Sequence, residues 1–244
     1  MNLPIYFISD THLRLTQSGK EEEKRRNLIS FIEHVIDKKG TLFIVGDFFD
    51  YWFEYKYVIP KAYFDVLTTL HRANERGIEI NYVLGNHDYW VGDFIKNKIF
   101  TEVYSNNLNL EIDGKIFHIT HGDGITSWHR GYRIMKKIIR SRVLIFLYRW
   151  IHPDLGYSFA RWVSRTGRHP IHTEEYNASV LKELQSYAEE QWKNSADHVI
   201  FGHYHQAKHV INNKGTFMVL GDWIIHRTFG LFDGNEFSLN YWRE

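Results

Sequence analysis

Short apolar runs alternate with amphipathic segments through the first 85 residues of this 244-residue chain. Three of the runs, rich in aliphatic and β-branched side chains, predict buried strands at residues 5–8, 42–45 and 78–84. Between them, apolar spacing over 21–39 and a proline-initiated segment at 60–76 predict two helices. This order of strand, helix and strand predicts an α/β fold with parallel strands.

Each predicted strand is followed directly by polar residues. Asp10 and His12 come after the first, Asp47 after the second, and Asn86 with His87 after the third. Ligands of open α/β sheets bind beyond the carboxyl ends of the strands, so we expect these side chains to share one site. If the backbone stays extended through the Asp-x-His pair, its two side chains point the same way.

The second half of the chain repeats this pattern. A hairpin around an Asp-Gly turn, at 108–112 and 115–120, is followed by His121, and a strand at 197–201 is followed by His203 and His205. Further strands are predicted near 207–211, 216–220 and 237–242. Seven potential ligands then stand at strand ends: Asp10, His12, Asp47, Asn86, His121, His203 and His205.

Residues 125–196 are helix-like and interrupt the strand pattern. Between 126 and 170 there are ten Lys or Arg and one acid, Asp154, interleaved with apolar side chains. We therefore expect a core formed by 1–124 and 197–244, and an inserted helical domain, or cap, at 125–196 with a basic and apolar surface. The more acidic helix predicted at 174–193 is expected to pack back on the core.

The amino-acid composition limits the kinds of metal site and binding partner that the chain can have. The chain has no cysteine, which excludes disulfides and thiolate metal sites, so any metal must be held by oxygen and imidazole ligands. A formal net charge of +1 excludes a globally basic nucleic-acid binder. The N-terminus lacks the pattern of a signal peptide, and we expect a cytoplasmic protein.

Seven oxygen and imidazole ligands are too many for one ion and suit two, with one carboxylate shared. Two divalent ions about 3.5 to 4 Å apart clamp a phosphate and lower the pKa of a bound water. The expected chemistry is hydrolysis of a phosphoester or phosphoanhydride.

The ordered motifs Asp-x-His, Gly-Asp-x-x-Asp, Gly-Asn-His-Asp, His-Gly-Asp and Gly-His-x-His resemble the calcineurin-like metallophosphoesterase superfamily. The resemblance implies a two-sheet αββα sandwich with a helical insertion. It also implies two ions, Mn²⁺ or else Fe, Zn²⁺ or Co²⁺. One would be held by Asp10, His12, Asp47 and His205, and the other by Asp47, Asn86, His121 and His203. Asp47 would bridge the ions and belong with Asn86 to the catalytic set, and His87 would contact the phosphate and protonate the leaving group or stabilise transition-state charge.

Within that superfamily the chain is most similar to the UDP-2,3-diacylglucosamine pyrophosphatases of lipid A biosynthesis. The similarity includes Gly131-Tyr132 after the His-Gly-Asp motif, the basic helical insertion and a closing Leu-Gly-Asp-Trp at 220–223. It implies cleavage of UDP-2,3-diacylglucosamine to lipid X and UMP, by an enzyme peripheral on an anionic surface, the cytoplasmic face of the inner membrane. His87 departs from the Arg that is typical of those enzymes.

The sequence also suggests residues that contact the substrate, although no motif marks them as it marks the metal ligands. Tyr132, Arg161 and Arg165 are candidates in the insertion, the two arginines because they lie four apart on a predicted helix. The aromatic residues after Asp47 are expected to form a wall facing the insertion: Phe48, Phe49, Tyr51 and Trp52. The alternatives are another phosphoesterase substrate, such as a cyclic nucleotide, a phospholipid head group or a phosphoprotein, and a nuclease activity. The apolar run 143–150 suits acyl chains better than nucleic acid.

Overall fold

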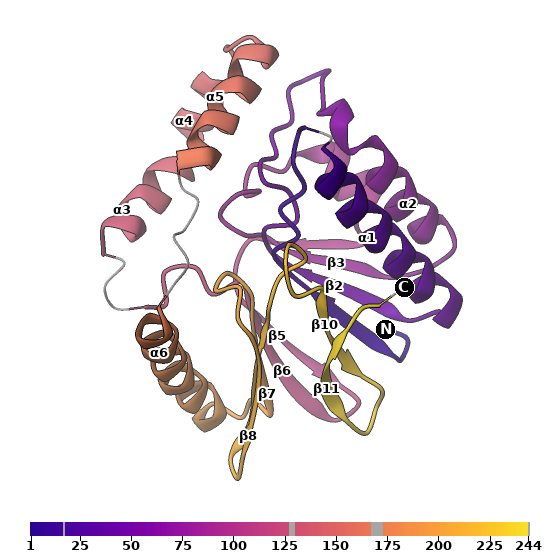
Figure 1. The fold of residues 1–244 in the computed structure, drawn as a ribbon, viewed down its shortest axis with the longest axis vertical. Helices are drawn as coiled ribbons and strands as arrows, with labels where there is room; N and C mark the ends of the chain where they lie inside the picture. Colours follow the sequence, from indigo (N-terminus) through magenta and orange to yellow (C-terminus); the bar gives the residue numbers. More distant parts are fainter. Residues whose placement is uncertain (17, 127–129, 167–172, 244) are drawn as a thin grey trace.

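Two β-sheets face each other in the computed structural model, which describes residues 1–16, 18–126, 130–166 and 173–243 (Figure 1). The side chains of 130, 132, 133 and 163–166 also lie outside the described part. The first sheet has the order β11-β10-β1-β2-β3-β4. Its strands are β1 (Ile5–Ile8), β2 (Thr41–Val45), β3 (Ile80–Val83), β4 (Glu102–Tyr104), β10 (Thr228–Phe232) and β11 (Phe237–Tyr241).

The second sheet has the order β5-β6-β7-β9-β8. Its strands are β5 (Leu108–Ile112), β6 (Lys115–Thr120), β7 (His198–Phe201), β8 (Ala207–Asn212) and β9 (Gly215–Leu220). Strands β1 to β4 are parallel in the first sheet, and β6, β7 and β9 are parallel in the second. The carboxyl ends of these strands therefore meet at the same edge of their sheet.

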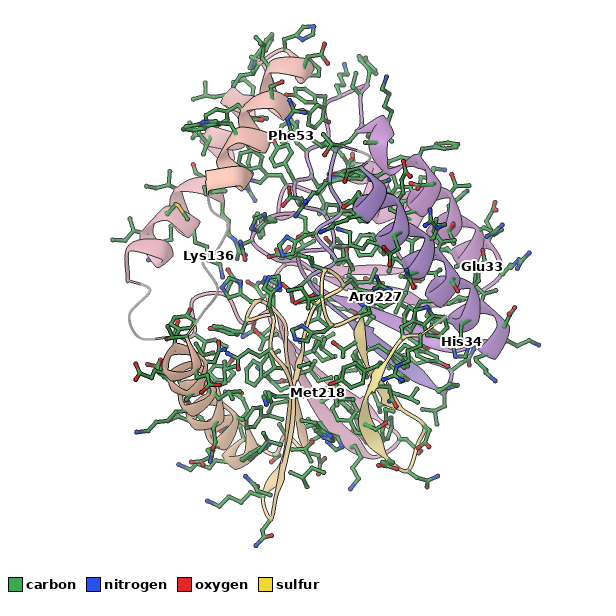
Figure 2. The ribbon with its side chains drawn as sticks, viewed as in Figure 1. Glu33, His34, Phe53, Lys136, Met218 and Arg227 are labelled. Carbon is green, nitrogen blue, oxygen red and sulfur yellow. The ribbon has the colours of Figure 1, made fainter. Side chains whose placement is uncertain are left out.

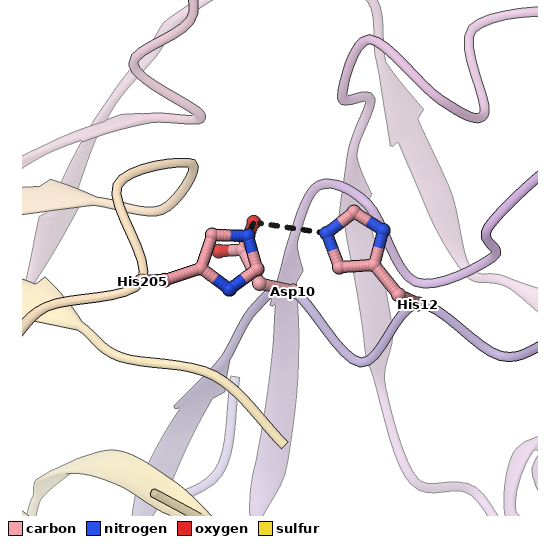
Figure 3. Close-up of side chains that lie close together, drawn as sticks. All are labelled: Asp10, His12 and His205. Atoms are coloured by element: carbon pink, nitrogen blue, oxygen red, sulfur yellow. Dashed lines mark ion pairs between the residues drawn. The ribbon is translucent and has the colours of Figure 1, made fainter. Parts of the chain in front are cut away.

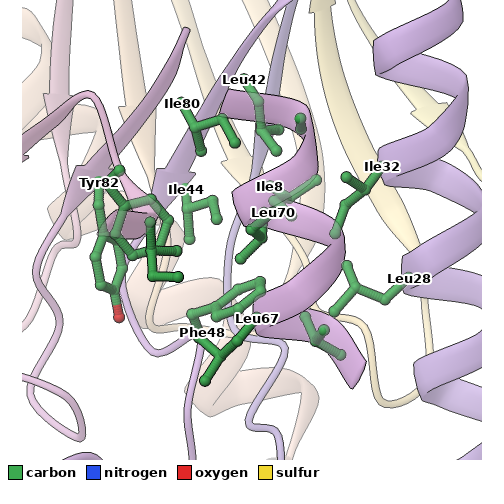
Figure 4. Packing of buried hydrophobic residues seen from close by; sticks show 14 of the residues in the cluster. Ile8, Leu28, Ile32, Leu42, Ile44, Phe48, Leu67, Leu70, Ile80 and Tyr82 are labelled. Carbon is green, nitrogen blue, oxygen red and sulfur yellow. The ribbon is translucent and has the colours of Figure 1, made fainter. Parts of the chain in front are cut away.

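Side chains alternate between the two faces of the first sheet. Ile5 and Phe7 point into the cluster between the sheets, where Phe7 stacks on Phe117 of β6 at 5.9 Å between ring centroids. Tyr6 and Ile8 point to the opposite face, which α1 (Gly19–Lys38) and α2 (Phe64–Glu75) cover. Figure 4 shows this outer layer, where leucine and isoleucine side chains of both helices meet the strands.

The outer face of the second sheet is covered by α6 (Glu174–Lys193). Val180, Leu184 and Ala188 of this helix are fully buried against Val199 and Phe217 of the sheet. The layers thus run helix, sheet, sheet, helix, which confirms the predicted αββα sandwich. The structure places α6 on the core, as expected, while the domain boundaries at 124 and 197 stay predictions.

Three further helices lie apart from the two sheets: α3 (Arg130–Ile139), α4 (Arg142–Tyr148) and α5 (Pro153–Thr166) (Figure 1). Their attachment to the core includes hydrogen bonds from Trp90 Nε1 to the Ile139 carbonyl and from the Tyr157 hydroxyl to the Phe53 carbonyl, both 2.9 Å. Within the described residues, none of the helices has the length and apolar character needed to cross a bilayer.

The predicted aromatic wall is wrong for three of its four residues. Phe48, Phe49 and Trp52 are fully buried in the cluster under α1 and α2, so they cannot face a substrate. Tyr51 does point toward the insertion, with ring centroids 6.3 Å from Tyr148 and 6.0 Å from Tyr157. The sequence also gave no indication of three short elements: β4, β10 and the π-helix Ile95–Ile99.

Candidate metal centre

The strand ends bring all seven predicted ligands together. Three overlapping groups of side chains each have their ligand atoms within 4.8 Å of one another: Asp10 with His12 and His205, His12 with Asp47 and His87, and Asp47 with His121 and His203. Asn86 joins the last group, because its Oδ1 lies 3.1 Å from Nε2 of His121. Asp47 belongs to two of the groups, and so does His12.

The first group surrounds a carboxylate oxygen of Asp10 (Figure 3). Nε2 of His12 and Nε2 of His205 each lie 3.7 Å from Asp10 Oδ1, too far for a hydrogen bond. Asp10 Oδ1 and His12 Nε2 are buried and have no hydrogen-bond partner among the described residues. Buried polar atoms are normally satisfied, so these convergent oxygen and imidazole atoms fit a divalent cation.

The second group surrounds the carboxylate of Asp47. Its Oδ2 lies 3.2 Å from Nε2 of His121, and its Oδ1 accepts a 2.9 Å hydrogen bond from the backbone N–H of His87. Nδ1 of His121 lies 2.9 Å from the Val45 carbonyl. Because that carbonyl can only accept, Nδ1 carries the hydrogen and Nε2 is the nitrogen left to bind a cation.

Five of the ligands have left-handed backbone angles: Asp10 (φ 53°), His12 (φ 42°), Asp47 (φ 50°), His203 (φ 67°) and His205 (φ 53°). The expectation of an extended Asp-x-His backbone is therefore wrong. Left-handed non-glycine residues cost about 1 to 3 kcal/mol each and cluster at functional sites, where the surrounding structure holds them. The surrounding fold holds these strained angles, and the side chains of different loops converge on one site.

Two motif glycines allow the close approach of these turns. A Cβ atom on Gly46 would overlap the ring of His121, and Gly46 also has a φ of +82°. A Cβ atom on Gly85 would overlap the carboxylate of Asp47. Any larger residue at either position would displace a metal-binding side chain.

The buried charges shift one another's pKa values. Burial raises the pKa of Asp47, but His121 and His87 outweigh it and bring that pKa well below the ordinary value. Burial lowers the pKa of His121, but the Asp47 carboxylate raises it to about 10. Burial and the neighbouring His121 lower the pKa of His203 to about 3. Without a metal ion the group therefore holds an ionised Asp47, a neutral His203 and a protonated His121, and His121 must release its Nε2 proton when a cation binds.

His87 shares a group of ligand atoms with His12 and Asp47, although the family resemblance assigns it to the phosphate rather than to a metal ion. Its Nδ1 lies 2.9 Å from the Asp50 carbonyl and so carries the hydrogen, which leaves Nε2 available to a substrate. Its ring meets that of His12 edge-on, with 4.8 Å between centroids. Burial lowers the pKa of His87, but the Asp47 carboxylate and the carbonyl of Asp50 together raise it above the ordinary value. This favours the cationic form of His87.

Sequence reasoning missed Asp88, which connects two of the ligand loops. Its buried carboxylate accepts hydrogen bonds from the backbone N–H groups of Phe48 (2.7 Å) and Gly85 (3.0 Å), and from the hydroxyl of Tyr82. Burial and the nearby Asp47 raise the pKa of Asp88 to about 6. Asp88 therefore fixes the loops after β2 and β3 relative to each other.

Asp222 was also missed as a site residue, although it follows strand β9 as the other ligands follow theirs. Its Oδ1 accepts hydrogen bonds from the backbone N–H groups of Ile224 (2.8 Å) and Ile225 (2.6 Å). Its Oδ2 lies 3.0 Å from Nδ1 of His226 and 3.4 Å from Nδ1 of His205. The carboxylate is thus placed to orient His205 with its Nε2 toward Asp10.

Of the three predicted substrate contacts in the insertion, only Arg161 has a described side chain. Arg161 is exposed on α5 and makes no hydrogen bond or ion pair within the described part of the chain. The side chains of Tyr132 and Arg165 lie outside the described residues.

The site lies in a part of the chain that matches a known protein family. The Calcineurin-like phosphoesterase family matches residues 3–207, which include all seven ligands. The chain belongs to this family. The protein is therefore a metallophosphoesterase, an enzyme that requires divalent metal ions.

Two curated relatives of this phosphoesterase carry the same name, UDP-2,3-diacylglucosamine hydrolase. The protein from Porphyromonas gingivalis is 28% identical over 255 aligned positions, covering 98% of this chain and 97% of the relative. The protein from Haemophilus ducreyi is 25% identical, covering 89% and 91%. A solved structure described as a novel archaeal phosphodiesterase is 17% identical and covers 98% of this chain and 99% of its own, with a TM-score of 0.48, which is too low to add weight.

Proposed function

We propose that this phosphoesterase hydrolyses UDP-2,3-diacylglucosamine to 2,3-diacylglucosamine 1-phosphate (lipid X) and UMP. The observation that carries the proposal is the presence, in one molecule, of a buried phosphoesterase centre and an insertion with exposed apolar side chains. Trp150 is 78% exposed and Phe146 is 58% exposed. Such a surface suits a substrate with acyl chains, and the name of the relatives specifies a diacylated nucleotide sugar.

The metal-binding assignment follows the groups of ligand atoms. Asp10, His12, Asp47 and His205 would hold one ion, and Asp47, Asn86, His121 and His203 the other, with Asp47 shared. Two such ions supply charge for the substrate phosphate and a water of lowered pKa. Mn²⁺ is the proposed metal, and Fe, Zn²⁺ and Co²⁺ suit the same nitrogen and oxygen ligands.

His87 stabilises the leaving group in this proposal. A water oxygen forms a new bond to phosphorus and releases its proton to the solvent, while the bond to the bridging oxygen breaks and the departing phosphate takes up the electron pair. His87 in its cationic form, held through Nδ1 by the Asp50 carbonyl, donates a hydrogen bond from Nε2 to that phosphate. The amide of Asn86 is held beside it in the same loop.

The proposed location is the cytoplasmic face of the inner membrane, with the insertion lying on anionic lipid. Exposed basic side chains accompany the apolar ones there, among them Lys137 and Arg149. Each basic residue near an anionic surface contributes about 1 kcal/mol to binding. Flotation with anionic vesicles should retain the protein, and the double substitution Lys137→Glu and Arg149→Glu should reduce retention. Equal retention on neutral vesicles would contradict this location.

The activity is tested with metal-loaded protein and three substrates: UDP-2,3-diacylglucosamine, bis(p-nitrophenyl) phosphate and single-stranded DNA. We expect release of UMP from the first at a kcat/KM far above that for the others. Cleavage of the simple diester or of DNA without release of UMP would overturn the proposal. The first result would favour another phosphoesterase substrate, and the second a nuclease.

A further inference from the structure

A polar cavity of about 550 Å³ lies beside the metal-binding side chains. Its walls come from the connection between β4 and β5, the end of β6 and the loop after it, and helices α3 and α6. The side chains used below are Asn106, Asn107, Thr120, Asp123, Lys136 and Tyr187. The volume falls within the range of about 300 to 1,000 Å³ in which pockets hold small-molecule ligands.

The cavity continues toward the metal centre. A smaller cavity of about 50 Å³ shares four lining residues with it, namely Asn106, Asn107, Asp123 and Lys136. The smaller cavity also reaches His121, a proposed metal ligand, and Arg140 of α3. A ligand in the wide part can therefore extend to the site of phosphate cleavage.

The wide part offers uncharged polar groups. Asn107 donates a hydrogen bond to the Tyr187 hydroxyl (3.1 Å) and accepts one from Thr120 (2.8 Å). The charge of Lys136 is matched by Asp123, with 2.6 Å between Nζ and Oδ2. Amides and hydroxyls without net charge suit the ribose and base of a nucleotide better than a phosphate.

The narrow part offers a cation. The guanidinium of Arg140 lies over the ring of Tyr89, 3.9 Å from its centroid, and is 3.9 Å from Asp123 Oδ2. A guanidinium against an aromatic ring presents N–H groups suited to a phosphate. The paired Asp123 and Lys136 line both parts, while Arg140 lines only the part that reaches His121. A phosphate beside Arg140, with the ribose and base in the wider part, matches this placement.

We propose that this cavity binds the nucleoside monophosphate half of the substrate, with its phosphate near Arg140 and His121 and its ribose and base beside Asn106 and Asn107. Lys136 of α3, labelled in Figure 2, lines this cavity, while Ile134 and Ile138 of the same helix are 64% and 58% exposed. Helix α3 then separates the polar half of the substrate from the acylated half. This inference rests on the proposed function, which supplies the nucleotide.

The test measures the affinity of the metal-loaded protein for UMP, uridine and inorganic phosphate by calorimetry. Asn106 is an exposed loop residue, and Asn106→Trp fills the cavity without touching the core. We expect UMP and uridine to bind at least tenfold more weakly and phosphate to bind as before. Asn213→Trp, in the exposed turn between β8 and β9, is the matched control and should change none of the three. Unchanged UMP affinity in a folded Asn106→Trp protein would overturn the inference.

A second measurement uses the wild-type protein. Photolabelling with 5-iodouridine monophosphate should modify peptides from 101–126 or from α6, and labelling confined to other peptides would also overturn the inference. Hydrolysis of UDP-2,3-diacylglucosamine by the wild-type protein is a separate result. If hydrolysis occurs while both cavity measurements fail, the proposed function stands and the cavity assignment falls. If UMP occupies the cavity without hydrolysis, the proposed function falls.

Discussion

Proteins usually bury apolar side chains and expose charged ones, and the metal centre and the insertion depart from this rule in opposite ways. At the centre, charged side chains are buried: Asp10 is 0% exposed, and Asp47 is 2% exposed. In the insertion, large apolar side chains are exposed, with Trp150 at 78% and Trp162 at 62%. A buried charge is costly without a partner, and an exposed apolar patch marks a binding surface. We therefore expect each region to be completed by a different kind of partner, cations at the centre and apolar groups at the insertion.

The two regions are also fixed to different degrees. Two ligand loops are joined by the carboxylate of Asp88, which accepts backbone hydrogen bonds from both, and Asp222 accepts several backbone hydrogen bonds within its own turn. The insertion meets the core through aromatic contacts such as Phe53 with Tyr148, 4.8 Å between centroids. Substitutions at the centre should therefore change chemistry, and substitutions on the outer insertion should change substrate affinity.

The largest effect is expected from Asp47→Ala, because this carboxylate belongs to both metal groups. We expect kcat/KM to fall by at least about 10³-fold, the upper end of the loss from removing one charge-stabilising group. Bound metal, measured by mass spectrometry, should fall as well. Asp37→Ala, an exposed position on α1, is the matched control and should leave both values unchanged. Full activity in Asp47→Ala would remove the basis of the two-metal assignment.

A smaller loss is expected from His87→Asn, which removes the cation near the leaving group but no proposed metal ligand. We expect kcat to fall about 10²-fold while the bound metal stays the same. His87→Arg keeps a cation and should recover a large part of the activity. Loss of metal from His87→Asn would instead make His87 a ligand, as its grouping with His12 and Asp47 allows.

The pH profile tests the charge on His87. The pKa of this histidine is raised, so the cationic form is lost as the pH rises through that value, and kcat should decline on the alkaline side. Arginine does not titrate in this range, so His87→Arg should lose that alkaline decline. An identical decline in both proteins would assign it to another group.

Much of the core was predictable because its signals are local. The strand 5–8 and the hairpin at 108–120 have the predicted bounds, since apolar runs and an Asp-Gly turn mark them directly. Parallel pairing then places the strand ends together, which is why the seven predicted ligands lie at one site. Strand β10 was not predicted, because Gly230 interrupts its apolar run and the strand is defined by its pairing with β1 and β11 in the folded sheet.

The predictions that were wrong or missed concern features that tertiary contacts determine. The left-handed angles at Asp10 and His12 are held by hydrogen bonds to the loop after β2, including His12 N–H to the Asp47 carbonyl at 3.0 Å. The sequence does not show which side of that loop faces the core, so Phe48 and Phe49 were placed in the wall. The sequence shows Asp88 only as part of a motif. Its hydrogen bonds to two different loops become visible only in the folded structure.

Asp222→Asn tests the support of the metal centre. Removing the carboxylate charge weakens the orientation of His205, and loss of such a supporting group typically lowers metal affinity about 10- to 100-fold. Calorimetric titration with Mn²⁺ measures this without a substrate. His226→Ala is the control, because His226 also contacts Asp222 but belongs to none of the metal groups. Equal affinities in the wild type and Asp222→Asn would show that Asp222 serves only its own turn.

The smallest effect is expected on the insertion, from the double substitution Trp150→Ala and Trp162→Ala. These exposed rings contribute little to folding, so the free energy of unfolding should change by no more than about 0.5 kcal/mol. If acyl chains bury part of this surface, KM for the diacylated substrate should rise about tenfold, which corresponds to 1.4 kcal/mol. Hydrolysis of bis(p-nitrophenyl) phosphate should stay the same, because that diester has no acyl chain.

Phe64→Ala provides the matched control for the tryptophan substitutions. Phe64 is 73% exposed at the start of α2, on the core rather than the insertion, so its loss removes apolar surface without touching the proposed acyl side. KM should therefore rise for the double tryptophan variant and stay the same for Phe64→Ala. An equal rise in both would mean that exposed apolar area in general, rather than the insertion, attracts the substrate. The contrast between the two regions would then no longer explain how the substrate is bound.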